Sequence, residues 1–149
     1  MVILGGSELK SIKNTADKLI KEYNTRDPFE LACYLDVVIF EEELGHVNGF
    51  YQACPKTKII HLNKNLSYNK KIEVCAHELG HALLHCKLNI LFLERNTFFV
   101  KNKYENEANK FAAELLISDD IIYKYKDFTM EEISCSEEIN IELLKLKFN

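Results

Sequence analysis

Two histidines and a glutamate in the middle of the chain have the spacing of a metal-dependent hydrolase site. They lie in His77-Glu78-Leu79-Gly80-His81, which fits the pattern H-E-x-x-H. Residues four apart on a helix lie on the same side, so the imidazoles of His77 and His81 can bind one tetrahedral Zn²⁺. Glu78 lies about 100° around the helix from His77, beside the metal but not bound to it. We therefore expect one zinc ion per chain, with Glu78 as the general base that takes a proton from water.

A catalytic zinc also needs a third protein ligand and an open fourth position. The candidates are carboxylates in the next strong helical pattern, over residues 104–117. Glu105 and Asn109 are four apart and share a face with small alanines, which would let this helix approach the first one closely. Glu107 points about 160° away from Asn109, towards solvent. Glu105 is thus the expected ligand and Glu107 the alternative, against the plain interpretation that both are surface glutamates.

Several further residues are candidates for supporting roles. Asn109 is expected to orient a ligand histidine by a hydrogen bond. His85 shares a helix face with His77 but lies about 12 Å farther along the axis, too far to bind the same ion. We expect His85 to be a buried polar residue or one that hydrogen-bonds to a ligand. Proteolysis also needs a donor for the tetrahedral oxyanion, and Tyr51, Tyr104 or His85 could supply it.

Hydrophobic periodicity predicts the elements that must position these residues. Helical spacing indicates, in chain order, helices over 7–23, from Pro28 onwards, over 69–84 and over 104–117, with two short ones within 130–148. Runs of β-branched and aromatic residues indicate strands at 37–40, 49–53 and 57–62. Helices, a small sheet and then further helices make an α+β fold. The strand over 57–62 is the expected edge to which a peptide substrate adds, and Ser136 is the expected cap of the last helix.

Length and composition indicate one domain over residues 1–149. At roughly 150 residues per domain, a chain of 149 residues is long enough for a single core, and its 47% of hydrophobic residues is ordinary for a globular protein. The balance of 19 Lys and Arg against 23 Asp and Glu gives a net charge of −4 without a basic cluster. This balance argues against direct binding of nucleic acid.

Targeting and redox signals indicate a cytoplasmic chain. The N-terminus lacks the basic start and the long apolar run of a signal peptide. The densest apolar stretch, Ile90 to Leu93, is far too short for a membrane span. The five cysteines are odd in number and form no Cys-x-x-Cys pair, so we expect reduced core residues.

The two motifs together resemble the ImmA/IrrE family of zinc metallopeptidases. The resemblance rests on the segment from Ala76 to His85 and on the later pattern Glu105-x-x-Ala108-Asn109-x-Phe111, and it covers roughly residues 8 to 148. It implies a zincin-like minimal metallopeptidase domain. It also implies a gluzincin-like site, in which two histidines and a downstream glutamate map onto the three ligands named above.

The resemblance further implies a cytoplasmic endopeptidase of a mobile genetic element that cleaves a helix-turn-helix repressor and so releases transcription. Two other functions stay open: a zinc-stabilised antirepressor that acts by binding without proteolysis, and the protease of a toxin–antitoxin or stress-response module. An intact Glu78 argues against binding alone, because a structural zinc site has no use for a general base. We expect a protein substrate, and neither a nucleic acid nor a membrane as a direct partner.

Overall fold

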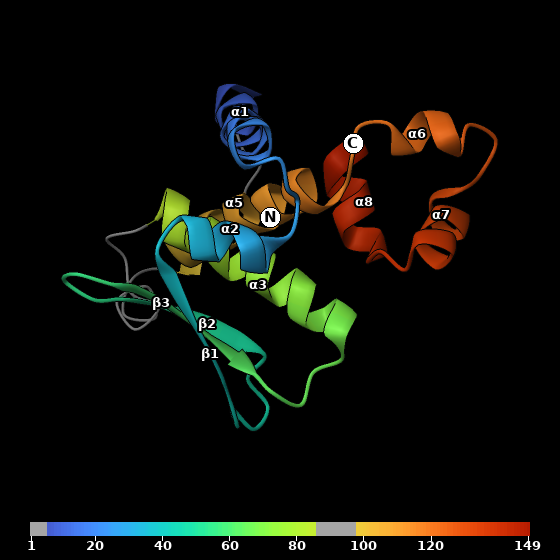
Figure 1. Ribbon diagram of the computed structural model, residues 1–149. Coiled ribbons are helices and arrows are strands. Elements are labelled where there is room, and N and C mark those ends of the chain that lie inside the picture. Colours follow the sequence, from blue (N-terminus) through green and yellow to red (C-terminus); the bar gives the residue numbers. More distant parts are fainter. Residues whose placement is uncertain (1–5, 86–97) are drawn as a thin grey trace.

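The α+β fold predicted from the sequence is confirmed by the computed structural model of the chain, which describes residues 6–85 and 98–149. Its helices are α1 (Gly6–Tyr23), α2 (Pro28–Tyr34), α3 (Tyr68–Leu84), α5 (Phe98–Leu116), α6 (Ile121–Lys124), α7 (Met130–Glu137) and α8 (Ile141–Phe148). Its strands are β1 (Val37–Glu42), β2 (Gly49–Ala53) and β3 (Lys58–Asn63). Figure 1 shows the sheet on one side of α3, α5 and α1 on the other, and α6, α7 and α8 grouped beyond the end of α5.

Side-chain caps determine where the helices around the site begin. The carboxylate of Asp27 accepts two backbone N–H groups at the start of α2, where Pro28 occupies the first position. Ser67 caps α3, which therefore begins at Tyr68, one residue earlier than expected. The same helix ends at its C-cap, His85. The H-E-x-x-H segment thus lies in the last turns of α3. Within the described ranges, no helix is long and apolar enough to cross a membrane.

The sheet has the order β1-β3-β2, which places β3 in the middle. β3 runs parallel to β1, with Ile60 opposite Ile39, and antiparallel to β2, with Ile60 opposite Tyr51. The prediction that strand 57–62 is the edge that receives a substrate is therefore wrong, because β3 has hydrogen-bonded neighbours on both sides. The physical reason is burial, since Ile60 and Leu62 are fully buried and favour the central position. β2 is the edge strand that contacts α3.

The C-terminal tail forms two helices as predicted, but the predicted cap is wrong. Ser136 lies inside α7 rather than ahead of α8. Glu138 has a left-handed φ of 54° and ends α7, and the side chain of Asn140 caps α8 by accepting the Glu142 N–H. Helix α6 has no counterpart in the sequence-based prediction, because its four residues are too few to show a period.

The described cysteines are free thiols, but they do not all lie in the core. Cys75 is buried and Cys54 half-buried, whereas Cys33 and Cys135 are exposed. The expectation of core residues is wrong for the last two, because the buried contacts of α2 and α7 are made by other residues of these helices. Cys86 and the apolar stretch over 90–93 lie outside the described residues.

Helices α3 and α5 approach closely where Gly80 faces Ala108. A Cβ at Gly80 would lie 3.1 Å from the Ala108 Cα and 3.2 Å from its carbonyl oxygen, tighter than ordinary van der Waals contact. This contact explains a glycine inside a helix, where it costs about 1 kcal/mol relative to alanine. It also sets Glu105, about one turn before Ala108, beside the H-E-x-x-H segment.

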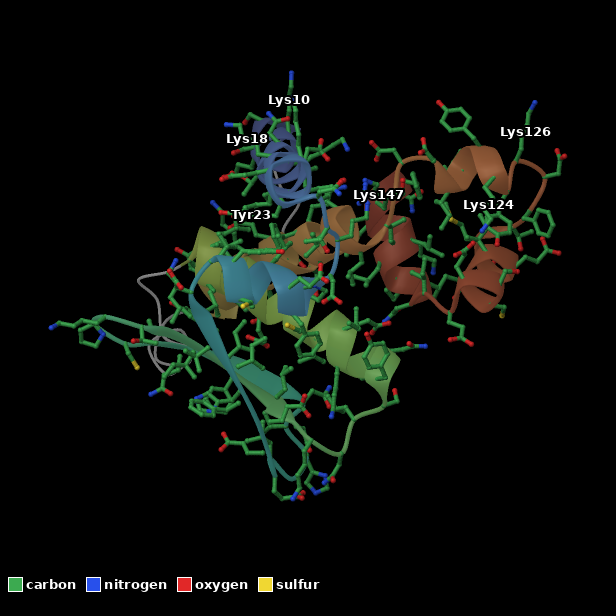
Figure 2. The ribbon with its side chains drawn as sticks, viewed as in Figure 1. Lys10, Lys18, Tyr23, Lys124, Lys126 and Lys147 are labelled. Carbon is green, nitrogen blue, oxygen red and sulfur yellow. The ribbon has the colours of Figure 1, made fainter. Side chains whose placement is uncertain are left out.

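A buried ion cluster centred on Glu114 docks α8 onto α5. The Glu114 side chain is 2% exposed, and its carboxylate lies 2.5 Å from the Lys147 Nζ and 2.9 Å from the Lys110 Nζ. Lys147, labelled in Figure 2, lies where α8 meets α5 and also contacts Asp119. Burial alone would raise the pKa of Glu114, but the hydrogen bonds from both lysines outweigh it and hold this pKa below its ordinary value.

Replacing Glu114 with Ala is expected to destabilise the protein by about 3–5 kcal/mol, because Lys110 and Lys147 would both lose the buried carboxylate that they share. Glu142→Ala is the matched control: its pair with Lys145 is exposed, so its loss should cost less than about 1 kcal/mol. Urea unfolding followed by circular dichroism measures both free energies. In the wild type the cluster stabilises the fold above pH 4.5 and loses this effect as the pH falls through the lowered pKa of Glu114. Equal losses in the free energy of unfolding for Glu114→Ala and Glu142→Ala would contradict the stabilising role of the buried ion cluster.

Candidate metal centre

Three side chains from α3 and α5 converge on one point. The Nε2 atoms of His77 and His81 are 3.2 Å apart, and the carboxylate oxygens of Glu105 lie 3.0 Å from the first and 3.1 Å from the second. Ligand atoms held tetrahedrally by one ion at about 2.0–2.1 Å lie about 3.3 Å from one another. The observed spacing therefore fits a single metal ion. Among the described residues, these three form the group whose ligand atoms, all within 4.8 Å of one another, could share an ion.

The charges of this group suit a cation. Burial alone would raise the pKa of Glu105, but its hydrogen bonds with His77 and His81 hold this pKa well below its usual range, so the carboxylate is ionised. Burial would likewise lower the pKa of His77, and the hydrogen bond with Glu105 raises it instead. A metal ion replaces such imidazole protons when it binds. Two imidazoles and one carboxylate are a donor set that leaves one position of a tetrahedral ion open.

A hydrogen bond from α5 orients His77. Its Nδ1 lies 2.7 Å from Oδ1 of Asn109. Because an amide oxygen only accepts, Nδ1 carries the proton and the lone pair of Nε2 faces the ligand group. Asn109 follows Glu105 by one helical turn, so one face of α5 supplies both the carboxylate and this hydrogen bond.

His81 is held by a chain of hydrogen bonds that runs through His85 to Glu107. The Nδ1 atoms of His81 and His85 are 3.1 Å apart, and Nε2 of His85 lies 2.5 Å from Oε2 of Glu107. A carboxylate only accepts, so His85 donates from Nε2 and accepts the proton of His81 Nδ1. This arrangement directs the Nε2 lone pair of His81 to the ligand group. The pKa of His85 is lowered, by burial first, which favours the neutral ring that the chain requires.

The placement of Glu107 towards solvent is wrong. Its side chain is only 13% exposed, because the end of α3 covers this side of α5 and brings His85 against it. Sequence reasoning missed this partner, although a signal was present. His85 shares a helix face with His81, and a buried histidine in that position needs an acceptor for its second nitrogen.

Glu78 is buried beside the ligand group without belonging to it. The residue is 5% exposed, and the backbone N–H of Tyr51 donates to its carboxylate. Its Oε2 is the one buried side-chain oxygen or nitrogen among the described residues without a hydrogen-bond partner. Burial raises the pKa of Glu78, and the neighbouring His77 and His81 lower it in part. Glu78 and His77 both line a cavity of about 360 Å³, where a carboxylate oxygen can accept a proton.

The three candidate oxyanion donors lie at different places. Tyr51 is buried on β2 and contacts Glu78 through its backbone. The ring of Tyr104 packs edge-on against His85, with centroids 4.5 Å apart. Both ring nitrogens of His85 are already hydrogen-bonded, which leaves no spare N–H for an oxyanion. The described lining of the cavity includes none of the three.

Replacing Glu107 with Ala should weaken metal binding by up to about tenfold, because His85 would lose the acceptor that holds its ring against His81, and losing the direct partner of a ligand histidine costs about ten- to a hundredfold. Glu107→Gln keeps an acceptor for His85 and should restore most of the affinity, a rescue that a merely structural role does not predict. Competition with a zinc chelator measures the affinity, and ¹⁵N NMR of the imidazoles reports the tautomer of His81. Equal affinities of the wild type and Glu107→Ala would contradict the hydrogen-bond chain.

Comparison with known proteins confirms the resemblance seen in the motifs. Residues 32–140 match the peptidase family described as the IrrE N-terminal-like domain. The chain is 41% identical over 139 residues to "Uncharacterized immunity region protein 2" of Bacillus phage phi105, which covers 91% of this chain and 88% of that protein. It is 32% identical over 131 residues to "Metallopeptidase ImmA" of Bacillus subtilis (strain 168), over 84% of this chain and 76% of that protein. The chain therefore belongs to the peptidase family of the IrrE N-terminal-like domain.

Proposed function

We propose that this chain is a zinc-dependent endopeptidase that cleaves a helix-turn-helix transcriptional repressor and so releases transcription of a mobile element or stress regulon. The observation that carries the proposal is the buried Glu78 carboxylate, with one unpaired oxygen, next to three converging metal ligands. A buried polar group without a partner is costly for the fold. General-base catalysis is the role that explains why this chain keeps one.

In the proposed reaction, His77, His81 and Glu105 hold one zinc ion. Zinc, when bound, supplies a Lewis acid that polarises the scissile carbonyl and lowers the pKa of water. Glu78 accepts a proton from the attacking water at Oε2 and later passes it to the leaving amine nitrogen. The backbone N–H of Tyr51 keeps the carboxylate in place during both transfers.

The corrected order of the sheet changes where the substrate backbone is proposed to lie. Substrates of peptidases can bind as an added strand at a sheet edge. β2 is the edge strand next to α3, and its first residue, Gly49, lines the cavity together with His77 and Glu78. We therefore place the substrate backbone beside Gly49 rather than beside β3.

The repressor substrate is supported by the resemblance of the two motifs to ImmA/IrrE peptidases. The names of two relatives agree with a repressor substrate, since one is named for a phage immunity region and the other is named a metallopeptidase. The net charge of −4 also favours a protein over a nucleic acid as the direct partner.

Two other functions would use the same fold. A zinc-stabilised antirepressor that acts by binding has no need of Glu78, and the protease of a toxin–antitoxin module would use the same residues on another protein. The unpaired Oε2 of Glu78 favours proteolysis over binding alone. A helix-turn-helix repressor encoded by the neighbouring gene would favour the first of the two proteolytic functions.

Glu78→Gln should keep the fold and the zinc while lowering the rate of cleavage by about 10²–10⁴-fold or more, because an amide cannot accept the proton. Glu105→Ala should instead lose zinc, which metal analysis of the purified protein measures. Glu142→Gln, at an exposed position on α8, is the matched control and should retain both properties. The assay co-expresses each variant with the neighbouring repressor and follows its fragments by mass spectrometry, together with the release of transcription.

Two results would change the assignment. Release of transcription by Glu78→Gln as strong as by the wild type would show that binding is the function. Cleavage of a different protein by the wild type, with the neighbouring repressor left intact, would keep the chemistry and replace the substrate.

A further inference from the structure

We propose that the cavity beside His77 and Glu78 binds the substrate side chain next to the scissile bond and selects an apolar side chain whose size is set by Leu143. This inference rests on the proposed function, because it names the kind of segment that the same site cuts. It places a determinant of specificity on α8, outside the two helices that carry the metal centre.

Apart from Glu78, the buried part of the cavity lining is apolar. Val74 of α3, Ala112 of α5 and Leu143 of α8 are 9%, 1% and 8% exposed. The polar lining residues outside the metal centre are half-buried or exposed. Among them, Lys70 and Glu73 pair at 3.1 Å and cancel each other's charge. Against Val74, Ala112 and Leu143, a charged substrate side chain would lose its hydration without gaining a partner, whereas an apolar one gains from burial.

The position and size of the cavity define what can enter it. His77 and Glu78 form part of its wall, so a side chain bound there belongs to a residue next to the bond that is cut. Its volume of about 360 Å³ is at the lower end for ligand pockets, which span roughly 300–1,000 Å³. The proposed addition of the substrate as a strand beside β2 requires an extended segment, as in an exposed linker between domains.

Contacts on two sides hold the cavity walls in place. On one side, the buried ion cluster described above and a hydrogen bond of 2.6 Å from the Lys110 Nζ to the Leu146 carbonyl fix α8 against α5. On the other side, β2 approaches α3 so closely that a Cβ at Gly49 would lie 2.7 Å from Cγ1 of Val74. Because both walls are fixed, the side chain of Leu143 determines how much room remains.

The test uses the metal-free wild-type protein and the peptides acetyl-Ala-Ala-X-Ala-Ala-amide, in which X is Leu, Met, Phe, Gly or Asp. Methyl NMR follows Val74 and Leu143 during each titration. The Leu and Met peptides should shift the methyl resonances of both residues and bind about tenfold or more tightly than the Gly and Asp peptides. Equal affinities for the Leu and Asp peptides, or no shift at either residue at millimolar peptide, would overturn the proposal.

Two variants test whether position 143 sets the size limit. Leu143→Phe fills the cavity and should weaken binding of the Leu and Met peptides about tenfold, whereas Leu143→Ala should move the preference to Phe. Leu146→Ala, at an exposed leucine of the same helix, is the matched control and should bind like the wild type. An unchanged order of preference in both Leu143 variants would overturn the role of Leu143. The wild-type series decides the proposal even where a variant does not fold.

Cleavage-site profiling of a peptide mixture with the zinc-loaded protein separates this inference from the proposed function. Enrichment of an apolar residue at one position beside the cut bond supports both the apolar subsite and the proposed proteolysis. Cleavage without such a preference keeps proteolysis and refutes the subsite. Methyl shifts at Val74 and Leu143, together with no cleavage of either the peptide mixture or the co-expressed repressor, keep the subsite and refute the proposed function.

Discussion

The close packing of α3 on α5 is the contact on which the candidate metal centre depends. Gly80 lets the backbone of Ala108 come nearer than a side chain would allow, and at this separation Glu105 meets the two histidines of α3. The lost helix stability at Gly80 is offset by burial around the contact, where Leu79 and Phe111 are fully buried. The same packing brings Asn109 of α5 to the far nitrogen of His77, and Glu107 of α5 to His85, which in turn holds His81. One steric constraint thus sets both the ligands and their orientation.

Two buried carboxylates show how environment separates a structural carboxylate from the proposed general base. Glu114 lies between two lysines, which hold its pKa below the ordinary value despite burial. Its charge is satisfied, and it fixes α8 on α5. Glu78 is as deeply buried, but one of its oxygens has no partner among the described residues and burial raises its pKa. The first arrangement favours stability, whereas the second keeps a proton acceptor at the wall of a cavity.

Local patterns predict much of this structure, because helical periods and the H-E-x-x-H spacing are properties of neighbouring residues. The bounds of β2 are predicted to the residue, and those of α3 to within one residue. Features that depend on distant segments are missed. They include the central position of β3, the burial of Glu107 by the end of α3, and the contribution of α8 to the cavity lining. The prediction that Ser136 caps the last helix is wrong because α7 continues to the left-handed turn at Glu138. Only after this turn can α8 begin, with Asn140 as its cap.

The most direct test of an open metal site with three protein ligands is X-ray absorption at the zinc edge of the purified protein. The proposed ligands His77, His81 and Glu105 predict nitrogen and oxygen neighbours alone, at about 2.0–2.2 Å, with the scattering pattern of two imidazoles. A sulfur neighbour at about 2.3 Å, or a third imidazole, would contradict this arrangement. Either result would mean that a cysteine or His85 closes the coordination shell and that the metal is structural.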